Sequence, residues 1–145
     1  MDFNKFNLFF RCGREYGRLM TKDLGINYTE YNICVFLYFY PDAPQDLISK
    51  SYMLDKTTVA KSLQILEQRG LITRSVNPQN RRQNLINLTE DGKTLIKDAV
   101  YVYDDWVEKV SGSLTAREQQ QFDAMLDKML KSAMALKEQT EHSTN

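Results

Sequence analysis

The chain has 145 residues, of which 42% are hydrophobic, and its 19 basic and 19 acidic side chains leave no net charge at pH 7. This length and apolar content favour a single domain with a buried core. The longest apolar run, residues 33–40, is too short to span a bilayer. The chain also lacks the basic start and apolar run of a signal peptide, so we expect a cytoplasmic protein without membrane segments.

The residue types that common catalytic sites require are scarce. The sole histidine is His142, and the sequence has no spacing typical of zinc ligands, a phosphate-binding glycine loop or a catalytic serine turn. We therefore predict that the protein is not an enzyme and has no catalytic residues, no metal and no cofactor.

The first third of the chain predicts helices separated by short breaks. A helix is expected over residues 4–24, and residues 25–28 interrupt it. Thr29 is predicted to cap a second helix that ends near residue 40. Residues 41–44 contain two prolines and predict a turn, after which residues 45–52 are expected to form another helix.

A capped amphipathic helix is predicted over residues 56–69. Asp55 precedes it as an N-cap, and Gly70 follows it as the residue that can take a left-handed conformation. One face carries the apolar stripe Val59, Leu63 and Leu66. The opposite face has no acidic residue and can donate hydrogen bonds to phosphates or base edges through Thr57, Lys61, Gln64 and Gln68. An ordinary surface helix would show the same pattern, so the flanking segments decide its meaning.

A β-hairpin with an arginine pair is predicted next. Residues 71–76 alternate like a strand, residues 77–80 have the composition of a turn, and residues 83–88 return as a second strand with Leu85 and Leu88 inward. Arg81 and Arg82 lie beside the turn, where they can approach phosphates or a narrow minor groove. Solubility alone could also account for arginines at a hairpin tip.

The order of helix, helix, hairpin and helix is that of a winged helix-turn-helix, in which one helix enters the major groove and the hairpin reaches a minor groove of double-stranded DNA. Between residues 50 and 82, seven basic and two acidic residues give a local charge of +5, which leaves −5 for the rest. Such a basic region favours oriented binding to DNA. The predicted DNA-binding residues are Lys56, Thr57, Thr58, Lys61, Gln64, Arg74, Arg81 and Arg82.

Two further helices are predicted in the C-terminal part. Thr89 is expected to cap a long helix through about residue 110, and Thr115 with Glu118 forms a capping box that begins the last helix. That helix has a broad apolar stripe made of Phe122, Met125, Leu126, Met129, Leu130, Ala133 and Met134. A stripe of this width needs a partner surface, which predicts a homodimer, with packing inside one chain as the alternative.

Several segments resemble the MarR family of transcriptional regulators. The central signature is Leu66-Glu67-Gln68-Arg69-Gly70-Leu71-Ile72-Thr73-Arg74 followed by Leu88-Thr89-Glu90-Asp91-Gly92, and residues 55–61 and 114–118 are also similar. The resemblance implies a mainly α fold with a small β-hairpin wing, spread over one MarR-like domain at residues 1–145. Within it we expect a winged helix-turn-helix lobe at about 29–92, dimerisation helices at about 1–28 and 93–137, and a polar tail at 138–145.

The family resemblance also implies a function. We expect a homodimeric, sequence-specific transcriptional regulator that binds a pseudo-palindromic operator and acts as a repressor relieved by a small molecule. Two positions depart from the family pattern. Asn80 occupies the position of a wing aspartate and cannot pair with an arginine by charge, so the wing should be less rigid or braced differently. Lys61 occupies a position where many members have arginine, which removes bidentate recognition of guanine but keeps the charge.

The aromatic residues and the cysteines indicate which kinds of effector the protein could sense. Eleven of the 16 aromatic residues lie in the first 40 positions, and Tyr16, Tyr28 and Tyr31 are candidates for a pocket that binds a small aromatic or amphipathic effector. Core packing is the alternative for these tyrosines. Some MarR-like regulators have a reactive cysteine in the first helix, which makes Cys12 a candidate redox sensor, although we expect Cys12 and Cys34 to be buried and inert. A winged helix used only to bind another protein remains a further alternative.

Overall fold

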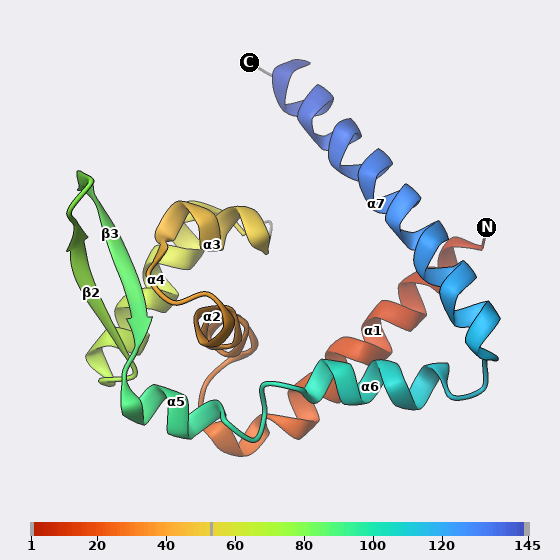
Figure 1. Ribbon diagram of the computed structural model, residues 1–145, viewed down its shortest axis with the longest axis horizontal. Coiled ribbons are helices and arrows are strands. Elements are labelled where there is room, and N and C mark those ends of the chain that lie inside the picture. Colours follow the sequence, from red (N-terminus) through yellow and green to blue (C-terminus); the bar gives the residue numbers. More distant parts are fainter. Residues whose placement is uncertain (1, 53, 144–145) are drawn as a thin grey trace. The chain divides into compact units, whose positions relative to one another are not determined.

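The computed structural model describes residues 2–52 and 54–143, so Met53 in the central segment and residues 144–145 of the expected polar tail lie outside the described residues. The described chain is mainly helical, with a small three-stranded sheet (Figure 1). It divides into two compact units, residues 1–104 and residues 105–145. Among the described helices, none combines the length and the apolar character that crossing a membrane requires.

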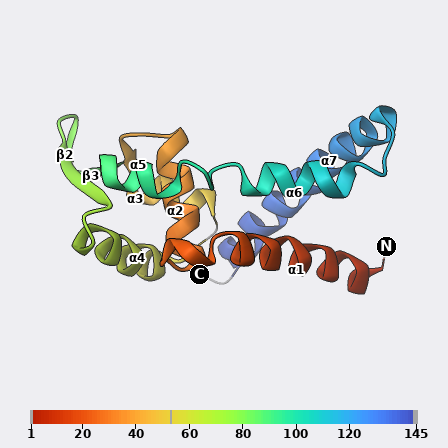
Figure 2. The same ribbon diagram turned by 90° about the horizontal axis from the view of Figure 1, so that it is seen from below.

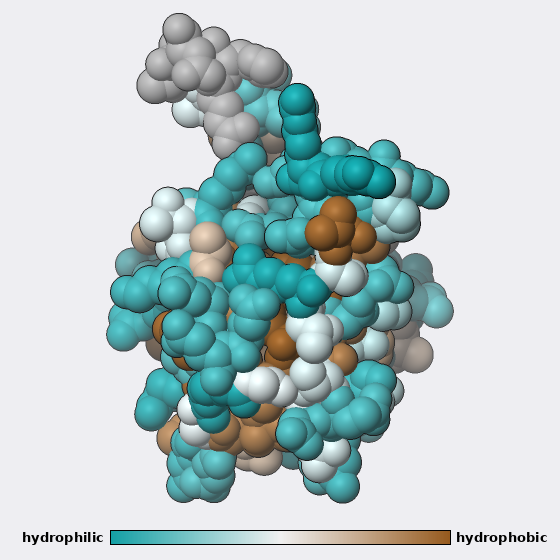
Figure 3. Space-filling view, turned by 90° about the vertical axis from the view of Figure 1, so that its left-hand side faces the viewer, coloured by the Kyte–Doolittle hydropathy of each residue, from teal (hydrophilic) through white to brown (hydrophobic). Residues whose placement is uncertain are grey.

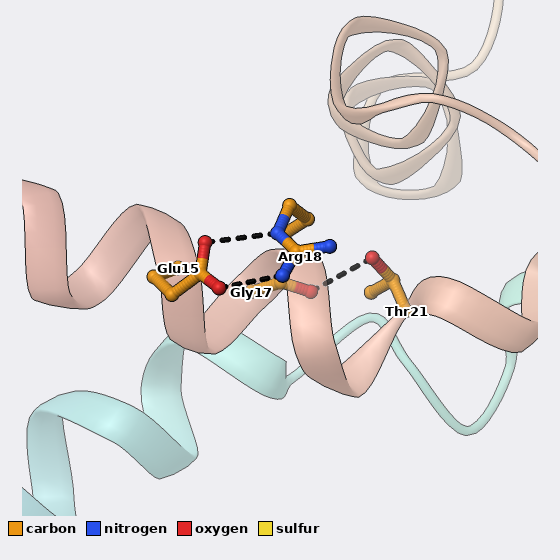
Figure 4. Close-up of polar contacts among 4 residues, drawn as sticks. All are labelled: Glu15, Gly17, Arg18 and Thr21. Carbon is orange, nitrogen blue, oxygen red and sulfur yellow. Dashed lines mark hydrogen bonds and ion pairs between the residues drawn. The ribbon is translucent and has the colours of Figure 1, made fainter.

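The first helix is shorter than predicted. Helix α1 spans Phe3–Met20, and a short 3-10 helix, η1, follows at Lys22–Leu24. The helix ends at Thr21, whose hydroxyl donates to the carbonyl oxygen of Gly17 at 2.7 Å (Figure 4). One turn earlier, an ion pair of 2.6 Å joins Glu15 and Arg18 on the exposed side of α1 (Figure 4). Gly25 then takes a φ of 65°, which a residue without Cβ adopts easily and which redirects the chain.

Helix α2, Tyr28–Phe39, is capped by Asn27 and not by Thr29 as predicted. The Asn27 side chain accepts from the backbone N–H of Glu30 at 2.9 Å, and the Glu30 carboxylate accepts from the backbone N–H of Asn27 at 3.0 Å. This reciprocal capping box satisfies two amide donors, whereas a cap at Thr29 would satisfy fewer. Thr29 therefore lies inside the first turn of α2.

Three strands and two helices form the central part of the first unit. Strand β1 is Ala43–Pro44, helix α3 is Gln45–Ser51, helix α4 is Lys56–Gln68, strand β2 is Ile72–Asn77 and strand β3 is Asn80–Leu88. The strands are antiparallel in the order β1-β3-β2. Because β1 has only two residues, the sequence predicted a turn at this point and not a strand.

Strand β3 differs from its prediction in two ways. It begins at Asn80, three residues earlier than expected, because the pairing with β2 continues to Asn77. Its buried residues are Ile86 and Leu88, while Leu85 is only half-buried. Side chains alternate between the two faces of a strand, so Leu85 and Leu88 cannot both point inward. The predicted inward pair was therefore wrong at Leu85.

The core of the first unit combines α2, α3, α4 and the sheet. The predicted stripe of α4 is confirmed, because Val59, Leu63 and Leu66 have no exposed surface. They pack with Ile33 of α2, Ile48 of α3 and other buried residues in one cluster. Full burial of each such aliphatic side chain contributes about 1.5–3 kcal/mol. This core holds α4 and the wing in a fixed relation.

The helix predicted from Thr89 to about residue 110 is two helices. Thr89 caps α5, Glu90–Ile96, as predicted, but α6 begins only at Val102 and ends at Ser111. Between them Ala99 and Val100 are buried. The carbonyl oxygen of Ala99 accepts a hydrogen bond from the Tyr31 hydroxyl at 2.7 Å. The same carbonyl also accepts from the Val102 N–H at 3.2 Å, so the chain turns at this point between the two helices.

The second unit contains the last helix, α7, at Ala116–Ser143. The predicted capping box is confirmed, because the Glu118 carboxylate accepts from the Thr115 backbone N–H at 2.8 Å and the Thr115 hydroxyl accepts from the Glu118 N–H at 3.3 Å. The predicted apolar stripe is exposed to a large extent in the single chain, as shown by Phe122 at 49% and Met125 at 55%.

Candidate nucleic-acid interface

Helix α4 is fixed at both ends. At its start the Asp55 carboxylate accepts from the Thr58 N–H at 2.8 Å and from the Thr58 hydroxyl at 2.5 Å. These hydrogen bonds lower the pKa of Asp55. At its end Gly70 has a φ of 69°, and the Leu71 N–H donates to the Leu66 carbonyl at 2.9 Å. This left-handed stop satisfies a carbonyl at the end of the helix, so the length of α4 is set by the sequence.

The face of α4 that the sequence assigned to DNA is exposed. It is formed by Lys56, Thr57, Lys61 and Gln64, and Figure 2 shows α4 beside α2 with the wing at its end. Thr58 is different, because it is half-buried and its hydroxyl is bound to Asp55. The exposed face therefore presents donors of both kinds, ammonium groups for phosphates and hydroxyl or amide groups for base edges.

Two of the predicted DNA-binding side chains, Lys56 and Arg74, form ion pairs with acidic residues of the same chain. Lys56 lies 3.1 Å from an oxygen of Asp46, and both side chains are exposed, so this pair is weak. Arg74 lies 2.9 Å from Glu67 with its side chain only 24% exposed. Arg74 thus joins strand β2 to the end of α4, which favours a bracing role over a contact with DNA.

The other three cations are available. Within residues 2–52 and 54–143, the side chains of Lys61, Arg81 and Arg82 form no ion pair. All three are exposed. The face of the molecule seen from the wing side is predominantly hydrophilic (Figure 3). Lys61 on α4 and the arginine pair on the wing therefore supply positive charge at two separate points, as binding to two neighbouring grooves requires.

The wing is braced by amide side chains. The register between β2 and β3 shifts at Val76 and Asn77. Across this irregularity the Asn77 amide donates to Gln83 at 3.1 Å, and the Asn77 oxygen accepts from the Gln79 N–H at 2.9 Å. Asn80 accepts from the Arg82 N–H at 3.2 Å. Of the two outcomes predicted for Asn80, the structure has the second, a wing that is braced differently and without a carboxylate.

At the base of the wing, Thr89 forms contacts beyond the helix cap that the sequence predicted. Thr89 donates its hydroxyl to the Gly70 carbonyl at 2.7 Å and its N–H to the Leu71 carbonyl at 3.0 Å, and it accepts from the Gly92 N–H at 3.0 Å. A Cβ on Gly92 would collide with the Leu71 carbonyl oxygen. The two halves of the central signature therefore meet here, and their contact sets the direction of the wing relative to α4.

The three candidate effector tyrosines occupy different environments. Tyr31 is completely buried, donates its hydroxyl to Ala99, and has a pKa raised by burial. Tyr16 is half-buried against the same small cluster as Tyr31, and Tyr28 is 38% exposed with its ring edge-on to Tyr103. Tyr31 thus fits the core-packing alternative, while Tyr28 and Tyr16 line its margin.

The two cysteines also differ. Cys34 is buried in the core, and burial raises the pKa of its thiol to about 12. Cys12 on α1 is exposed, so the prediction that both cysteines are buried was wrong for Cys12. Its position on an outward face of α1, away from the core of the winged lobe, explains the difference. An exposed thiol is accessible to oxidants, whereas Cys34 is not.

The helix pair α3 and α4, the arginine-bearing hairpin and the charge at two points define a winged helix-turn-helix, a class of DNA-binding protein. A model of the MarR family matches residues 26–83. The organic hydroperoxide resistance transcriptional regulator of Bacillus subtilis (strain 168) is 30% identical over 132 residues, which cover 91% of this chain and 82% of that protein. The chain therefore belongs to the MarR family, and it is a DNA-binding transcriptional regulator.

Solved structures share this fold. A MarR transcriptional regulator from Methanosarcina mazei Go1 has a TM-score of 0.79 at 24% identity and covers 92% of this chain and 96% of its own. MepR of S. aureus in a DNA-binding conformation has a TM-score of 0.82 at 25% identity, with 90% of this chain and 96% of its own covered. These likenesses extend over both terminal helices, so the predicted mainly α fold with a wing is confirmed.

Proposed function

We propose that the protein acts as a homodimer that binds a pseudo-palindromic operator and represses transcription until an effector lowers its affinity for DNA. The proposal rests on positively charged side chains at two places, Lys61 on α4 and Arg81 with Arg82 on the wing. None of these side chains forms an ion pair within the described residues, and one core supports both elements. A complex of S. aureus MepR with DNA has a TM-score of 0.81 to this chain, which supports DNA as the partner.

The homodimer is supported by α7. Its apolar stripe remains exposed in the single chain, with Leu130 at 54% and Met134 at 50%. Large exposed apolar patches on soluble proteins mark interaction sites. A second copy would offer the same stripe, as a two-fold symmetric interface requires. Two copies of α4 would then read half-sites about 34 Å apart, which is one turn of the duplex.

Relief by an effector is supported by the tyrosines near the junction of α1, α2 and α6. Tyr103 of α6 covers Gly17 of α1 so closely that a Cβ there would lie 2.5 Å from its hydroxyl oxygen. Tyr28 and Tyr31 pack against Tyr103 with ring centroids 6.4 Å and 6.2 Å away. A small aromatic or amphipathic molecule that separates these rings would move α1 relative to the winged lobe and change the spacing of the two α4 helices.

The test is a gel mobility shift with the DNA upstream of the chain's own gene, repeated at several salt concentrations. We expect a sequence-selective complex that weakens steeply with salt. Lys61→Ala should weaken binding and change sequence preference, whereas Arg82→Ala should weaken binding more uniformly across sequences. Lys97→Ala, an exposed lysine at the end of α5, is the matched control and should bind like the wild type.

Two outcomes would contradict this proposal. If no selective complex forms at any salt concentration, the winged helix serves another purpose, such as binding a protein. If Lys61→Ala and Arg82→Ala both retain the wild-type affinity, the DNA-binding face lies elsewhere. Addition of benzoate or deoxycholate as aromatic and amphipathic probes then tests relief, which we expect to appear as release of the DNA.

A second candidate effector is an oxidant that reacts at Cys12. Two observations favour it: Cys12 is exposed on α1, and the Bacillus subtilis relative is a regulator of organic hydroperoxide resistance. Treatment with cumene hydroperoxide should then release the DNA from the wild type and not from Cys12→Ser, in which the buried Cys34 is retained. Equal release from both proteins would remove Cys12 from the mechanism.

A further inference from the structure

A hollow of about 430 Å³ lies between the start of α2 and one side of α4. We call it the α2–α4 notch. Its walls include Asn27, Tyr28 and Thr29 at the start of α2, and Thr58, Lys61, Ser62 and Ile65 on α4. The notch lies wholly within the first compact unit, and Lys61 belongs both to the notch and to the exposed face of α4.

Ser62 is the unusual residue of the notch. It is only 6% exposed, and its hydroxyl forms no hydrogen bond with any residue that the structure describes. A serine inside a helix commonly donates to the carbonyl four residues earlier, as Ser49 does to Gln45 at 3.2 Å. Ser62 lines the notch, and its oxygen is not among the buried polar atoms that lack a partner, so the hydroxyl is accessible there. It can therefore donate to and accept from a ligand in the notch.

The opposite wall adds donors. The backbone N–H groups of Tyr28 and Thr29 belong to the first turn of α2 and have no acceptor among the described residues, and the Thr29 hydroxyl also has no partner there. The N-terminus of a helix attracts anions through such amides. The nearby Glu30 carboxylate is already occupied, because it accepts from the backbone and side-chain nitrogens of Asn27 at 3.0 and 2.7 Å.

We propose that the α2–α4 notch binds one phosphate group of the DNA backbone. Hydroxyl groups of Thr29 and Ser62 and the amides at the start of α2 together match a tetrahedral oxyanion, and Lys61 beside them adds positive charge to the surroundings. Because Lys61 also lies on the face of α4 that meets the major groove, the phosphate in the notch is the one at the edge of that groove. Phosphate contacts of this kind fix the register of a recognition helix on the duplex.

This inference rests on the proposed DNA binding and adds two positioning residues, Thr29 and Ser62. The test uses Ser62→Ala and Thr29→Val in the full chain, with Ser49→Ala as the matched buried serine outside the notch. Thermal melting should find Ser62→Ala about as stable as the wild type, because the Ser62 hydroxyl forms no hydrogen bond with the described residues. On unmodified operator DNA, loss of one hydrogen bond to a charged phosphate should weaken binding about tenfold.

Methylphosphonate groups, introduced one at a time into the retarded DNA, neutralise single phosphates and locate the contact. We expect one position in each half-site at which the substitution weakens the wild type about tenfold and weakens Ser62→Ala much less. Ser49→Ala should respond to every position like the wild type. Coupling of Ser62 to one phosphate is a result that a purely structural role of the serine would not produce.

Three outcomes would overturn the inference, and they are distinguishable. A wild type that binds no DNA removes the proposed function and this inference with it. A wild type that binds DNA, with Ser62→Ala equally sensitive at every methylphosphonate position, removes only the notch contact. If sulfate at matched ionic strength raises the melting temperature of the wild type and not of Ser62→Ala, while no methylphosphonate position is coupled, the notch holds a free anion and not DNA.

Discussion

The winged lobe, α2 to α5, and the last helix, α7, use the same apolar periodicity with opposite results. In the lobe the stripe of α4 is completely buried by α2, α3 and the sheet. In α7 the stripe is largely exposed, with Met129 at 39% and Phe122 at 49%. The sequence pattern therefore identifies an apolar face, but only the number of neighbouring elements decides whether one chain can cover it. The lobe covers its own face, and α7 requires another surface, which we propose is a second copy.

The largest expected effect is loss of the dimer through a charge placed in the apolar stripe of α7. A Met129→Glu change places a charge in the middle of the apolar stripe, where a dimer interface would have to desolvate it. We expect monomers, and operator binding weaker by about a hundredfold because two linked lobes bind DNA far more tightly than one. Light scattering measures the oligomer and a mobility shift measures the affinity.

Gln120→Glu is the control for that experiment, because it adds the same charge on the polar side of α7. It should remain dimeric and should bind DNA normally. Far-ultraviolet circular dichroism should find both variants folded, since the lobe buries its own core. A Met129→Glu protein that stays dimeric at micromolar concentration would mean that α7 does not form the interface.

The next largest effect is a loss of stability of the winged lobe. Gly92→Ala brings a Cβ against the Leu71 carbonyl oxygen and to 3.1 Å from Leu88. Because the obstacle is backbone at the base of the wing, relief requires movement of α5 or β2. We expect a loss of about 3 kcal/mol in the free energy of unfolding, measured with urea. Gly112→Ala is the control: its Cβ would be 3.5 Å from the nearest atom and should have little effect on stability.

A smaller loss is expected at the neighbouring cap. Thr89→Val keeps the shape of the side chain but removes the hydroxyl that accepts from Gly92 and donates to Gly70. The expected cost is about 1 kcal/mol, which is typical of a lost N-cap. Thr94→Val, on the exposed side of α5, controls for the change in residue type. Equal stability of the two variants would show that water replaces both hydrogen bonds of Thr89.

These caps explain which parts of the fold were predictable. Asp55, Gly70, Thr89 and Thr115 each begin or end a helix through contacts within a few residues, so these roles could be predicted directly from the sequence. The contact between Tyr31 and Ala99 at the break between α5 and α6 could not, because these two residues are 68 positions apart in the chain. Local rules identified these caps, although they missed the capping box of Asn27 and Glu30, and they cannot identify contacts between residues far apart in the chain.

The candidate site also combines features that the sequence could predict with features that depend on tertiary contacts. The positive charge of α4 and of the wing tip was predictable, because it requires only the identity and spacing of the residues. The pairing of Arg74 with Glu67 was not, since it depends on how the end of α4 meets β2. Ser62 was also not predictable, because a serine among apolar residues gives no sign that its hydroxyl faces a hollow.

A modest change in the salt dependence of DNA binding is expected from substitutions at Asn80 in the wing. Asn80→Asp keeps the acceptor for the Arg82 N–H and adds a charge beside the arginine pair. We expect the slope of log affinity against log salt concentration to fall by about one unit, because one fewer phosphate is neutralised. Asn80→Ala separates the two causes, since it removes the brace without adding charge. An unchanged slope in Asn80→Asp would mean that the wing arginines do not contact phosphates.

The smallest expected effect is a dependence of stability on pH, which arises from one carboxylate in the winged lobe and one at the start of α7. Hydrogen bonds from Thr58 lower the pKa of Asp55 in the lobe, and hydrogen bonds from Thr115 lower the pKa of Glu118 at the start of α7. A carboxyl whose pKa is lower in the folded state stabilises the fold above its ordinary pKa, and this contribution is lost as the pH falls through the lowered value. Urea unfolding of Asp55→Asn should therefore differ from that of the wild type at pH 7, and the difference should shrink as the pH falls below the ordinary pKa of an aspartate. A difference that does not change with pH over this range would mean that the cap acts through shape and not through charge.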